Sequence, residues 1–261
     1  MKPLVSILIP TCDRPHYLEQ ALKSALDQTY PRMEIVICDN SEDDASERMV
    51  KAYQSKRKGH KIRYFRNSEN LGPIINQQKC LELSKGKYVN YLMDDDLFHP
   101  VKIEKMMHYF LKYKEVSLVT SQRRIIDGDG HPIYVPPVGT FRKLYDKDTI
   151  VDGRKLSERM LRDRTNYIGE PTTVLFRKKD LTEPFGVLSG QQIYFGVDLA
   201  SWLNLLTRGK AVYMVQPLSY LRYHSQQLSK NEFAKQIAQL DKEVIASFAK
   251  SQGYRVPDKG K

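Results

Sequence analysis

Three consecutive aspartates are the most distinctive chemical feature of the sequence. Asp94, Asp95 and Asp96 follow directly after the apolar run that ends at Met93. Adjacent carboxylates repel one another, and a hard divalent cation among them relieves that repulsion. Ligands that are all oxygen atoms favour Mg²⁺ or Mn²⁺ over zinc, and such an ion can bridge phosphate oxygens. We therefore predict a metal site that binds a diphosphate. The alternative is a solvated acidic turn that caps the helix predicted to begin near Pro100.

Polar residues also stand at the ends of three earlier strand-like runs. Thr11 and Asp13 follow the first run, Asp39 follows the second, and Arg66 ends the third. A carboxylate on the second strand, level with a threonine on the first, can read the hydrogen-bonding edge of a nucleobase. The alternative for Asp39 is a turn residue that caps the next helix. Arg66 and Asn70 are placed to face a sugar or a phosphate, and ordinary turn chemistry is the alternative for both.

The elements that must position these side chains alternate between strand and helix. Short apolar runs rich in β-branched residues predict strands over 4–10, 34–38, 61–66, 87–93 and 115–121. Apolar residues at helical spacing predict helices between them, the first opened by Pro15 and the last over 100–113. This alternation is typical of an α/β protein with a mostly parallel sheet covered on both faces. Ligands bind such sheets beyond the carboxyl ends of the strands, where the polar residues stand.

The pattern changes after about residue 124. The turn 127–130 predicts a hairpin between 123–126 and 133–135. Loops are predicted over 135–148 and 184–195, helices over 152–162 and 197–208, and strands over 172–177, 211–215 and 219–223. We predict one domain over 1–228, with halves 1–124 and 125–228, followed by an amphipathic helix and tail over 229–261. That helix is expected to pack on the domain, and the alternative is reversible contact with a membrane surface or a partner.

Composition narrows the class of protein. The chain has 261 residues, 41% of them hydrophobic and 28% charged, which is typical of a globular protein with one substantial core. No apolar run approaches the ~20 residues that cross a bilayer. The three cysteines are widely spaced and predict neither a disulfide framework nor a zinc site, so we expect an intracellular protein. The formal net charge of +11 favours an anionic partner: nucleic acid, an anionic membrane surface or a phosphorylated substrate.

Four segments of the first half resemble family 2 glycosyltransferases, in the family's order and at similar separations. They are VSILIPTCDR over 5–14, IVICDNS over 35–41, NLG over 70–72 and GKYVNYLMDDDLFHP over 86–100. The resemblance covers roughly the first 120 residues well and the rest loosely. It implies the GT-A fold, a Rossmann-type mixed, mostly parallel sheet flanked by helices, with the second half on the acceptor side. It also implies a nucleotide-diphosphate sugar donor, Mn²⁺ or Mg²⁺, and inversion at the anomeric carbon.

The resemblance further implies roles for residues of the donor side. The residues that would line the nucleotide-sugar pocket are Pro10, Thr11, Asp13, Asp39, Arg66 and Asn70. Asp39 would accept from the base, usually uracil in this family, so the donor would be a UDP- or dTDP-sugar. Among the three aspartates, Asp94 would lean toward the ribose and sugar, while Asp95 or Asp96 would ligate the ion.

An inverting transfer also needs a carboxylate that takes the acceptor proton on the face opposite the diphosphate. The family's base normally opens a helix as a Glu-Asp pair, and Asp198 matches it with Val197 in place of Glu. The alternative for Asp198 is a helix-start residue favoured by the dipole. Glu170 lies in a segment that resembles the acceptor side, as a second candidate base or sugar contact. Arg222 and His224 lie in a late Tyr-Arg-x-His element, where Arg222 would pair with the diphosphate and His224 would touch metal or phosphate. A structural histidine is the alternative for His224.

Two other function classes compete with this interpretation. A nucleotidyltransferase that makes nucleotide sugars needs a glycine-rich, basic loop after the first strand, and 12–16 contains no glycine. A nucleic-acid-binding module needs basic residues interleaved with aromatics on one face, whereas the Lys and Arg residues are spread along the chain. The favoured prediction is a glycosyltransferase with a glycan, lipid-linked or small-molecule acceptor and no nucleic-acid partner. We expect it in the cytoplasm or in peripheral contact with the inner membrane surface.

Overall fold

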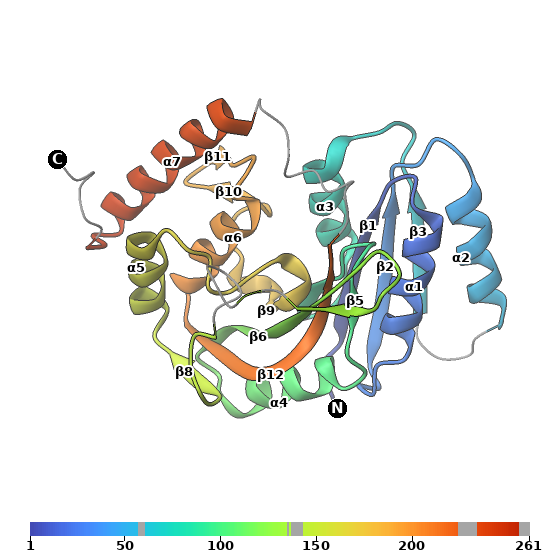
Figure 1. The fold of residues 1–261 in the computed structure, drawn as a ribbon, viewed down its shortest axis with the longest axis horizontal. Helices are drawn as coiled ribbons and strands as arrows, with labels where there is room; N and C mark the ends of the chain where they lie inside the picture. Colours follow the sequence, from blue (N-terminus) through green and yellow to red (C-terminus); the bar gives the residue numbers. More distant parts are fainter. Residues whose placement is uncertain (57–60, 135, 137–142, 224–233, 256–261) are drawn as a thin grey trace.

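One mixed sheet runs through the whole molecule (Figure 1). The computed structural model describes residues 1–56, 61–134, 136, 143–223 and 234–255. Within these ranges the main sheet has ten strands, and a separate hairpin has two.

The N-terminal part of the sheet is parallel. β1 (Val5–Thr11) lies between β2 (Met33–Asp39) and β4 (Tyr88–Tyr91), and β3 (Lys61–Arg66) lies outside β2. Every residue of β1 and β2 is buried, which is typical of strands covered on both faces. The backbone register pairs Thr11 with Asp39 and Asp39 with Arg66, so the predicted strand-end residues lie level with one another.

Helices cover both faces of this sheet. α1 (Pro15–Leu26), α2 (Ala45–Lys56) and α4 (Lys102–Lys112) pack on one face, against alternate residues such as Ile7. α3 (Gly72–Leu83) packs on the opposite face, to which Leu8 points. Successive side chains of a strand point to opposite faces, which explains this division. The predicted apolar face of α1 is confirmed, because its buried residues are Leu18, Ala21, Leu22, Ala25 and Leu26.

The second part of the sheet is mixed. β6 (Val116–Ile126) and β12 (Lys210–Arg222) form a long parallel pair, and β9 (Leu175–Arg177) runs antiparallel between β4 and β6. Three short strands add to these two: β5 (Leu97–Phe98) and β8 (Thr149–Val151) pair with β12, and β7 (Pro132–Ile133) pairs with β6. The main path is therefore β3-β2-β1-β4-β9-β6-β12-β5.

Two predicted strand breaks were wrong. The segments 115–121 and 123–126 form the single strand β6, because no turn residue separates them. The segments 211–215 and 219–223 form the single strand β12, whose register shifts around Pro217. Proline lacks an N–H and interrupts the ladder locally, but the strand continues beyond it. The predicted hairpin after β6 is confirmed by its pairing with β7.

The remaining elements of the second half cover the sheet face that α3 covers. α5 (Gly153–Asp163), α6 (Val197–Leu206) and α7 (Ala234–Ser251) contribute buried residues to the same apolar cluster, among them Trp202 and Phe248. Two predictions need correction. The strand predicted from Thr172 begins only at Leu175, because a 3₁₀ turn, η2 (Pro171–Thr173), precedes it. The loop predicted over 184–195 contains the hairpin β10 (Val187–Leu188) and β11 (Gln191–Gln192).

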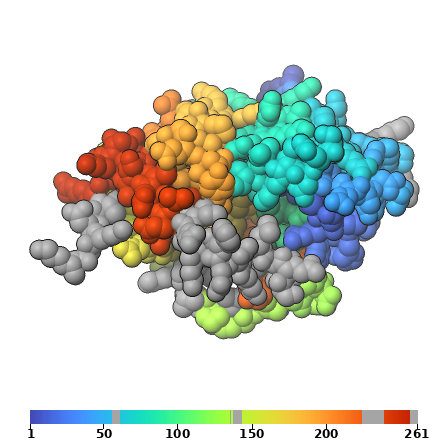
Figure 2. All heavy atoms as spheres, turned by 90° about the horizontal axis from the view of Figure 1, so that it is seen from above, coloured from blue at the N-terminus to red at the C-terminus, as the bar shows by residue number. Residues whose placement is uncertain are grey.

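The C-terminal helix packs on the domain, as expected. Figure 2 shows α7 (red) directly beside the orange segment of the second half, and Figure 1 places it at the opposite end of the molecule from α2. Val244, Ile245 and Phe248 make its contacts with the apolar cluster. Within the described residues, no helix has the length and apolar character needed to cross a membrane.

Candidate active site

The carboxyl end of β1 meets the segment that follows β4. The Thr11 hydroxyl donates a hydrogen bond of 2.8 Å to Asp94 Oδ2. Arg14, directly before α1, places Nη1 3.4 Å from Asp94 Oδ1 and 3.2 Å from Asp95 Oδ2. The sequence analysis did not select Arg14 as a site residue. A cation at the end of a central strand, opposite an acidic triplet, was the signal that could have found it.

Asp94 and Asp95 differ in their surroundings. Burial, and to a smaller extent the charge of Asp95, raise the pKa of Asp94 from 3.8 to about 6, against the opposing effects of Arg14 and the Thr11 hydrogen bond. The Asp94 side chain is 7% exposed and the Asp95 side chain 14%. Asp94 is therefore a buried carboxylate held by β1, whereas Asp95 offers more surface to a ligand.

Asp96 is held by the second half of the chain. Its Oδ2 accepts from the Thr172 hydroxyl at 2.5 Å, and its Oδ1 accepts from the backbone N–H of Arg222 at 3.0 Å. Burial, with a smaller contribution from the charge of Asp95, raises the pKa of Asp96 well above its usual range. Because the protein already engages both oxygens of Asp96, this residue joins the triplet to η2 and β12.

The three aspartates do not converge on one point. Among the described residues, the group of three ligand-bearing side chains whose donor atoms lie within 4.8 Å of one another is Asp127, Asp129 and His131, in the turn after β6. An ion at the triplet would use one or two carboxylates and fill its shell with phosphate oxygens and water, as Mg²⁺ usually does. The clustered negative charge that raises two of the three pKa values fits such a hard cation.

Arg222, predicted to pair with the diphosphate, is held within the protein. Its guanidinium is buried and donates to the carbonyls of Asp95 (2.7 Å), Asp127 (3.0 Å) and Gly128 (2.8 Å), and to the Gln20 amide oxygen at 2.8 Å. This guanidinium fastens the β6–β7 turn to the aspartate segment, so pairing with a diphosphate would break several hydrogen bonds. The predicted ligand His224 lies outside the described residues.

Asp39 lies beneath the surface at the end of β2. Its Oδ1 accepts from the backbone N–H (2.8 Å) and the hydroxyl (2.5 Å) of Ser41, and its Oδ2 accepts from the Tyr64 hydroxyl at 2.5 Å. Pro10 is likewise buried within β1. Three hydrogen bonds within the protein and complete burial therefore hold the Asp39 carboxylate in place.

A cleft of about 670 Å³ lies above the ends of β2 and β3. Its lining residues are Asn40, Ser41, Glu42, Arg66, Asn67, Ser68, Glu69 and Asn70. Arg66 is exposed at its wall and donates to the Glu42 carbonyl. Asp13, exposed and in the left-handed region at φ 54°, donates its N–H to the Ser41 hydroxyl at 2.7 Å. The volume is within the range of pockets that hold small ligands and cofactors.

A network of asparagine amides fixes the floor of this cleft. Asn67 Nδ2 donates to the side-chain oxygens of Asn40 (2.7 Å) and Asn76 (3.0 Å), and Asn40 Nδ2 donates to Asn70 Oδ1 at 3.0 Å. Asn76 Nδ2 in turn donates to the backbone carbonyls of Thr11 (3.3 Å) and Cys38 (3.0 Å). Buried amides bonded in this way tie three strand ends to α3. Asn40, directly after β2, and Asn76, within α3, were not predicted as site residues, since neither carries a distinctive spacing.

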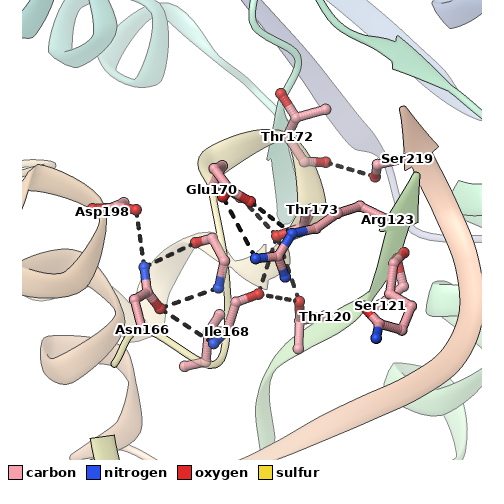
Figure 3. A network of polar contacts seen from close by, with 12 residues as sticks. Thr120, Ser121, Arg123, Asn166, Ile168, Glu170, Thr172, Thr173, Asp198 and Ser219 are labelled. Carbon is pink, nitrogen blue, oxygen red and sulfur yellow. Dashed lines mark hydrogen bonds and ion pairs between the residues drawn. The ribbon is translucent and has the colours of Figure 1, made fainter. Parts of the chain in front are cut away.

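The predicted base lies at the start of α6 (Figure 3). Asp198 Oδ2 accepts from Asn166 Nδ2 at 2.9 Å, and its Oδ1 accepts from the backbone N–H of Leu199 at 2.8 Å. Asn166 Oδ1 accepts from the N–H groups of Ile168 (3.2 Å) and Gly169 (3.1 Å), so a closed loop orients the amide. Burial, with a smaller contribution from the charge of Glu170, raises the pKa of Asp198 from 3.8 to about 6, while the hydrogen bonds from Leu199 and Asn166 oppose the shift.

Glu170 stands between the triplet and Asp198. Its negative charge raises the pKa of both Asp96 and Asp198, which places its carboxylate within electrostatic reach of each. Glu170 Oε2 lies 3.0 Å from Nε of Arg123, a buried residue of β6 (Figure 3). Two residues later, Thr172 holds Asp96. Arg123, Asn166 and Thr172 were not predicted as site residues, because only the fold brings them together.

These contacts make one continuous polar edge. The cleft at β2 and β3 leads to the aspartate triplet after β4, and then to the wall that carries Glu170 and Asp198. In open α/β sheets, ligands bind at this edge, beyond the carboxyl ends of the strands.

The sequence model of glycosyl transferase family 2 matches residues 6–182, so the chain belongs to that family. The predicted class of enzyme and the GT-A-like fold are thereby confirmed, and the family decides between the three function classes in favour of a glycosyltransferase.

Particular relatives agree with this assignment. An uncharacterized protein of Mycobacterium tuberculosis (strain CDC 1551 / Oshkosh) is 30% identical over 227 residues, which cover 85% of this chain and 68% of the relative. The putative teichuronic acid biosynthesis glycosyltransferase TuaG of Bacillus subtilis (strain 168) is 27% identical over 233 residues, 89% of this chain and 84% of TuaG.

Solved structures of S. aureus TarS share the fold. The crystal structure of TarS 1–349 matches with a TM-score of 0.64 at 18% identity, and its complex with UDP-GlcNAc matches with a TM-score of 0.61 at 17% identity. These matches cover 85% and 92% of this chain, which spans 60% and 65% of the respective TarS chains.

Proposed function

We propose that this chain is an inverting, divalent-metal-dependent glycosyltransferase that moves a sugar from a nucleotide diphosphate to an acceptor hydroxyl. The observation that carries the proposal is the order of three features along one sheet edge: a nucleoside-sized cleft, an acidic triplet and a wall with a buried carboxylate. A nucleotide sugar laid along this edge would have its base, its diphosphate and its sugar over these features in turn.

The donor we propose is a UDP- or dTDP-sugar. Ser41, Arg66 and Asn70 would line the nucleoside site, with Asp13 at its rim. Asp39 would accept from the base once the Tyr64 or Ser41 hydroxyl turns away, while Pro10 would shape the floor from within β1. The likeness to TarS, which has been crystallised with UDP and with UDP-GlcNAc, motivates a UDP-sugar as the first donor to test.

The cation we propose is Mn²⁺ or Mg²⁺, ligated by Asp95. Asp96 would serve as a second ligand or as the support that fixes the segment, with Asp94 and Thr11 on the side of the ribose and sugar. When bound, the ion would neutralise negative charge on the departing diphosphate. Arg14 would add a second positive charge there, and His224 remains a proposed further contact.

Asp198 would act as the base of a single in-line displacement. The acceptor oxygen bonds to the anomeric carbon as the bond to the diphosphate breaks, and the acceptor proton passes to Asp198. A pKa of about 6 leaves this carboxylate mostly ionised at neutral pH and still basic enough to take a proton. Asn166 would orient it, and Glu170, held by Arg123, would contact the acceptor.

The acceptor we propose is a carbohydrate, either free or lipid-linked, or a small molecule with a comparable hydroxyl. The relative TuaG is named for teichuronic acid biosynthesis, and this supports a role in polysaccharide assembly. A lipid-linked acceptor would bring the protein into peripheral contact with the inner membrane surface, and the excess of positive charge on the chain suits an anionic surface.

Binding of nucleotide diphosphates tests the proposed donor site. We expect UDP and dTDP to bind more tightly than CDP, GDP and ADP in the presence of Mn²⁺, as measured by titration calorimetry. Asp39→Asn should lower the preference for UDP over CDP about tenfold, because it removes a charged acceptor worth about 1.5 kcal/mol. Asp44→Asn is the matched control, since this exposed carboxylate in the same turn pairs with Arg48. Equal affinities of the unmodified protein for all of these nucleotide diphosphates would count against the proposed donor.

A further inference from the structure

Helix α6 has Gly196 at its N-cap, a residue with no side chain that could accept a hydrogen bond. The first turn of a helix presents N–H groups that have no partner inside the helix, and the side chain of Asp198 accepts from one of them, the Leu199 N–H. Whatever fixes the backbone directly before this turn therefore also sets the direction of the proposed base.

A carboxylate of α7 holds the backbone directly before this turn. Asp241 Oδ2 accepts from three successive backbone N–H groups, those of Tyr194 (3.2 Å), Phe195 (2.6 Å) and Gly196 (3.2 Å). Its Oδ1 accepts a second contact from Tyr194 at 3.1 Å. The residue is only 5% exposed, although it is a charged residue on a surface helix. A carboxylate placed against consecutive N–H groups at a helix start is stabilised by charge-assisted hydrogen bonds and by the helix dipole.

The rest of α7 holds this carboxylate in place. Phe248 and Ala249 are buried, and Val244 and Ile245 pack on the apolar cluster that includes α6. Arg154 of α5 donates to the Gly253 carbonyl just beyond the helix. In Figure 2 the red helix lies directly against the orange segment that contains this junction.

Asp198 lies two residues after the segment 194–196 that Asp241 holds. The Gly196 carbonyl accepts from the Ala200 N–H at 2.8 Å and so starts the helical hydrogen-bond pattern around Asp198. The side chain of Asp198 is then fixed between the Leu199 N–H and Asn166. A shift in the backbone of 194–196 would therefore move the carboxylate relative to the donor.

We propose that Asp241 is a positioning residue for the transfer reaction: through the N–H groups of 194–196 it fixes the first turn of α6 and thereby the direction of the Asp198 carboxylate. The inference rests on the proposed role of Asp198 as base. On this inference, α7 contributes to the transfer reaction by positioning the base.

Variants of Asp241 test this inference in the full-length protein. The readouts are UDP release from the best donor of the nucleotide survey, UDP affinity in Mn²⁺, and amide hydrogen exchange at 194–196. Asp241→Ala should accelerate exchange at these three amides and lower kcat about 10–100-fold, because a displacement of about 1 Å can cost 100-fold. KM for the donor and UDP affinity should change less than about twofold, because the donor cleft lies on the other side of the triplet.

Two further variants separate positioning from general stability. The kcat and the amide exchange rates of Asp241→Asn should lie between those of the unmodified protein and those of Asp241→Ala. The amide oxygen can still accept from the three N–H groups, while the amide nitrogen faces Tyr194. Glu243→Gln is the matched control: it removes a negative charge two residues further along α7, where Glu243 is exposed and accepts from Gln239. This control should leave kcat unchanged.

The decisive comparison is a double-mutant cycle with Asp198→Asn. If Asp241 acts through Asp198, Asp241→Ala should cause no further loss of turnover in the Asp198→Asn background. Faster exchange at 194–196 in Asp241→Ala with a normal kcat would overturn the inference. Equal losses of kcat and UDP affinity in this variant would overturn it too, and so would losses of turnover that are fully additive in the double mutant. Normal turnover of Asp198→Asn alone would instead overturn the proposed base, so the two failures are distinguishable.

Discussion

Asp198→Asn should lower turnover about 10²–10⁴-fold, which is the usual contribution of a positioned general base. Asparagine keeps the shape of the side chain and can still accept from the Leu199 N–H, but it cannot take a proton. UDP affinity should stay within about twofold, because no donor-side contact is lost. Asp163→Asn, at an exposed carboxylate of α5 in the same half, is the control and should keep full activity. Near-normal turnover of Asp198→Asn would exclude this residue as the base.

The pH dependence gives this prediction a second measurement. The rate of the unmodified protein should rise with pH through about 6, as Asp198 loses its proton. Stability should change in the opposite sense. The folded-state pKa of Asp198 is raised above 3.8, so its stabilising contribution is complete below that pH and is lost as the pH rises through about 6. The free energy of unfolding of Asp198→Asn relative to the unmodified protein should therefore increase across this window. A constant difference would mean that Asp198 has an ordinary pKa.

Asp95→Ala should remove most of the dependence of UDP affinity on Mn²⁺. Loss of a residue that merely supports a metal ligand typically costs 10–100-fold, so loss of a direct ligand should cost at least about 100-fold. Asp95 is the test position because it is the more exposed carboxylate of the Arg14-linked pair, while Asp96 is already held by Thr172 and the Arg222 N–H. Calorimetric titration of UDP with and without Mn²⁺ measures the effect.

Asp129→Ala is the matched control for the metal prediction. Asp129 belongs to the group of Asp127, Asp129 and His131 in the β6–β7 turn, where a cation could also bind. We expect this variant to keep the Mn²⁺ dependence of UDP binding. Loss of the dependence in Asp129→Ala, with normal behaviour of Asp95→Ala, would move the metal site to that turn.

Much of the fold was predictable because its signals are local. The first parallel strands are continuous apolar runs, and Pro15 with the helical spacing from Leu18 onward marks α1. The strand ends were therefore placed correctly, and the register brings Thr11, Asp39 and Arg66 level. Beyond residue 124 the errors concern where one strand ends and the next begins. Two strands were predicted over 211–215 and 219–223, but Pro217 lies inside the single strand β12, because pairing with β6 on both sides of it outweighs one missing N–H.

The site was predictable only in its charged residues at strand ends. Residue type and position indicated the aspartate triplet, but not that Asp94 is held by β1 and Asp96 by η2. The pairing of Arg222 with a diphosphate stays a prediction, and the sequence could not show that carbonyls of the β6–β7 turn would accept from its guanidinium. Asn166, Arg123 and Asp241 depend on contacts between segments distant in the chain, and no local pattern encodes these.

The stereochemistry of donor cleavage tests the central proposal most directly. In the absence of an acceptor, water can take the place of the acceptor hydroxyl, and proton NMR can identify the sugar anomer released from an α-linked UDP-sugar before the anomers equilibrate. With Mn²⁺ present, a single displacement assisted by Asp198 predicts that the β anomer is formed first. Initial release of the α anomer would contradict an inverting transfer at this site.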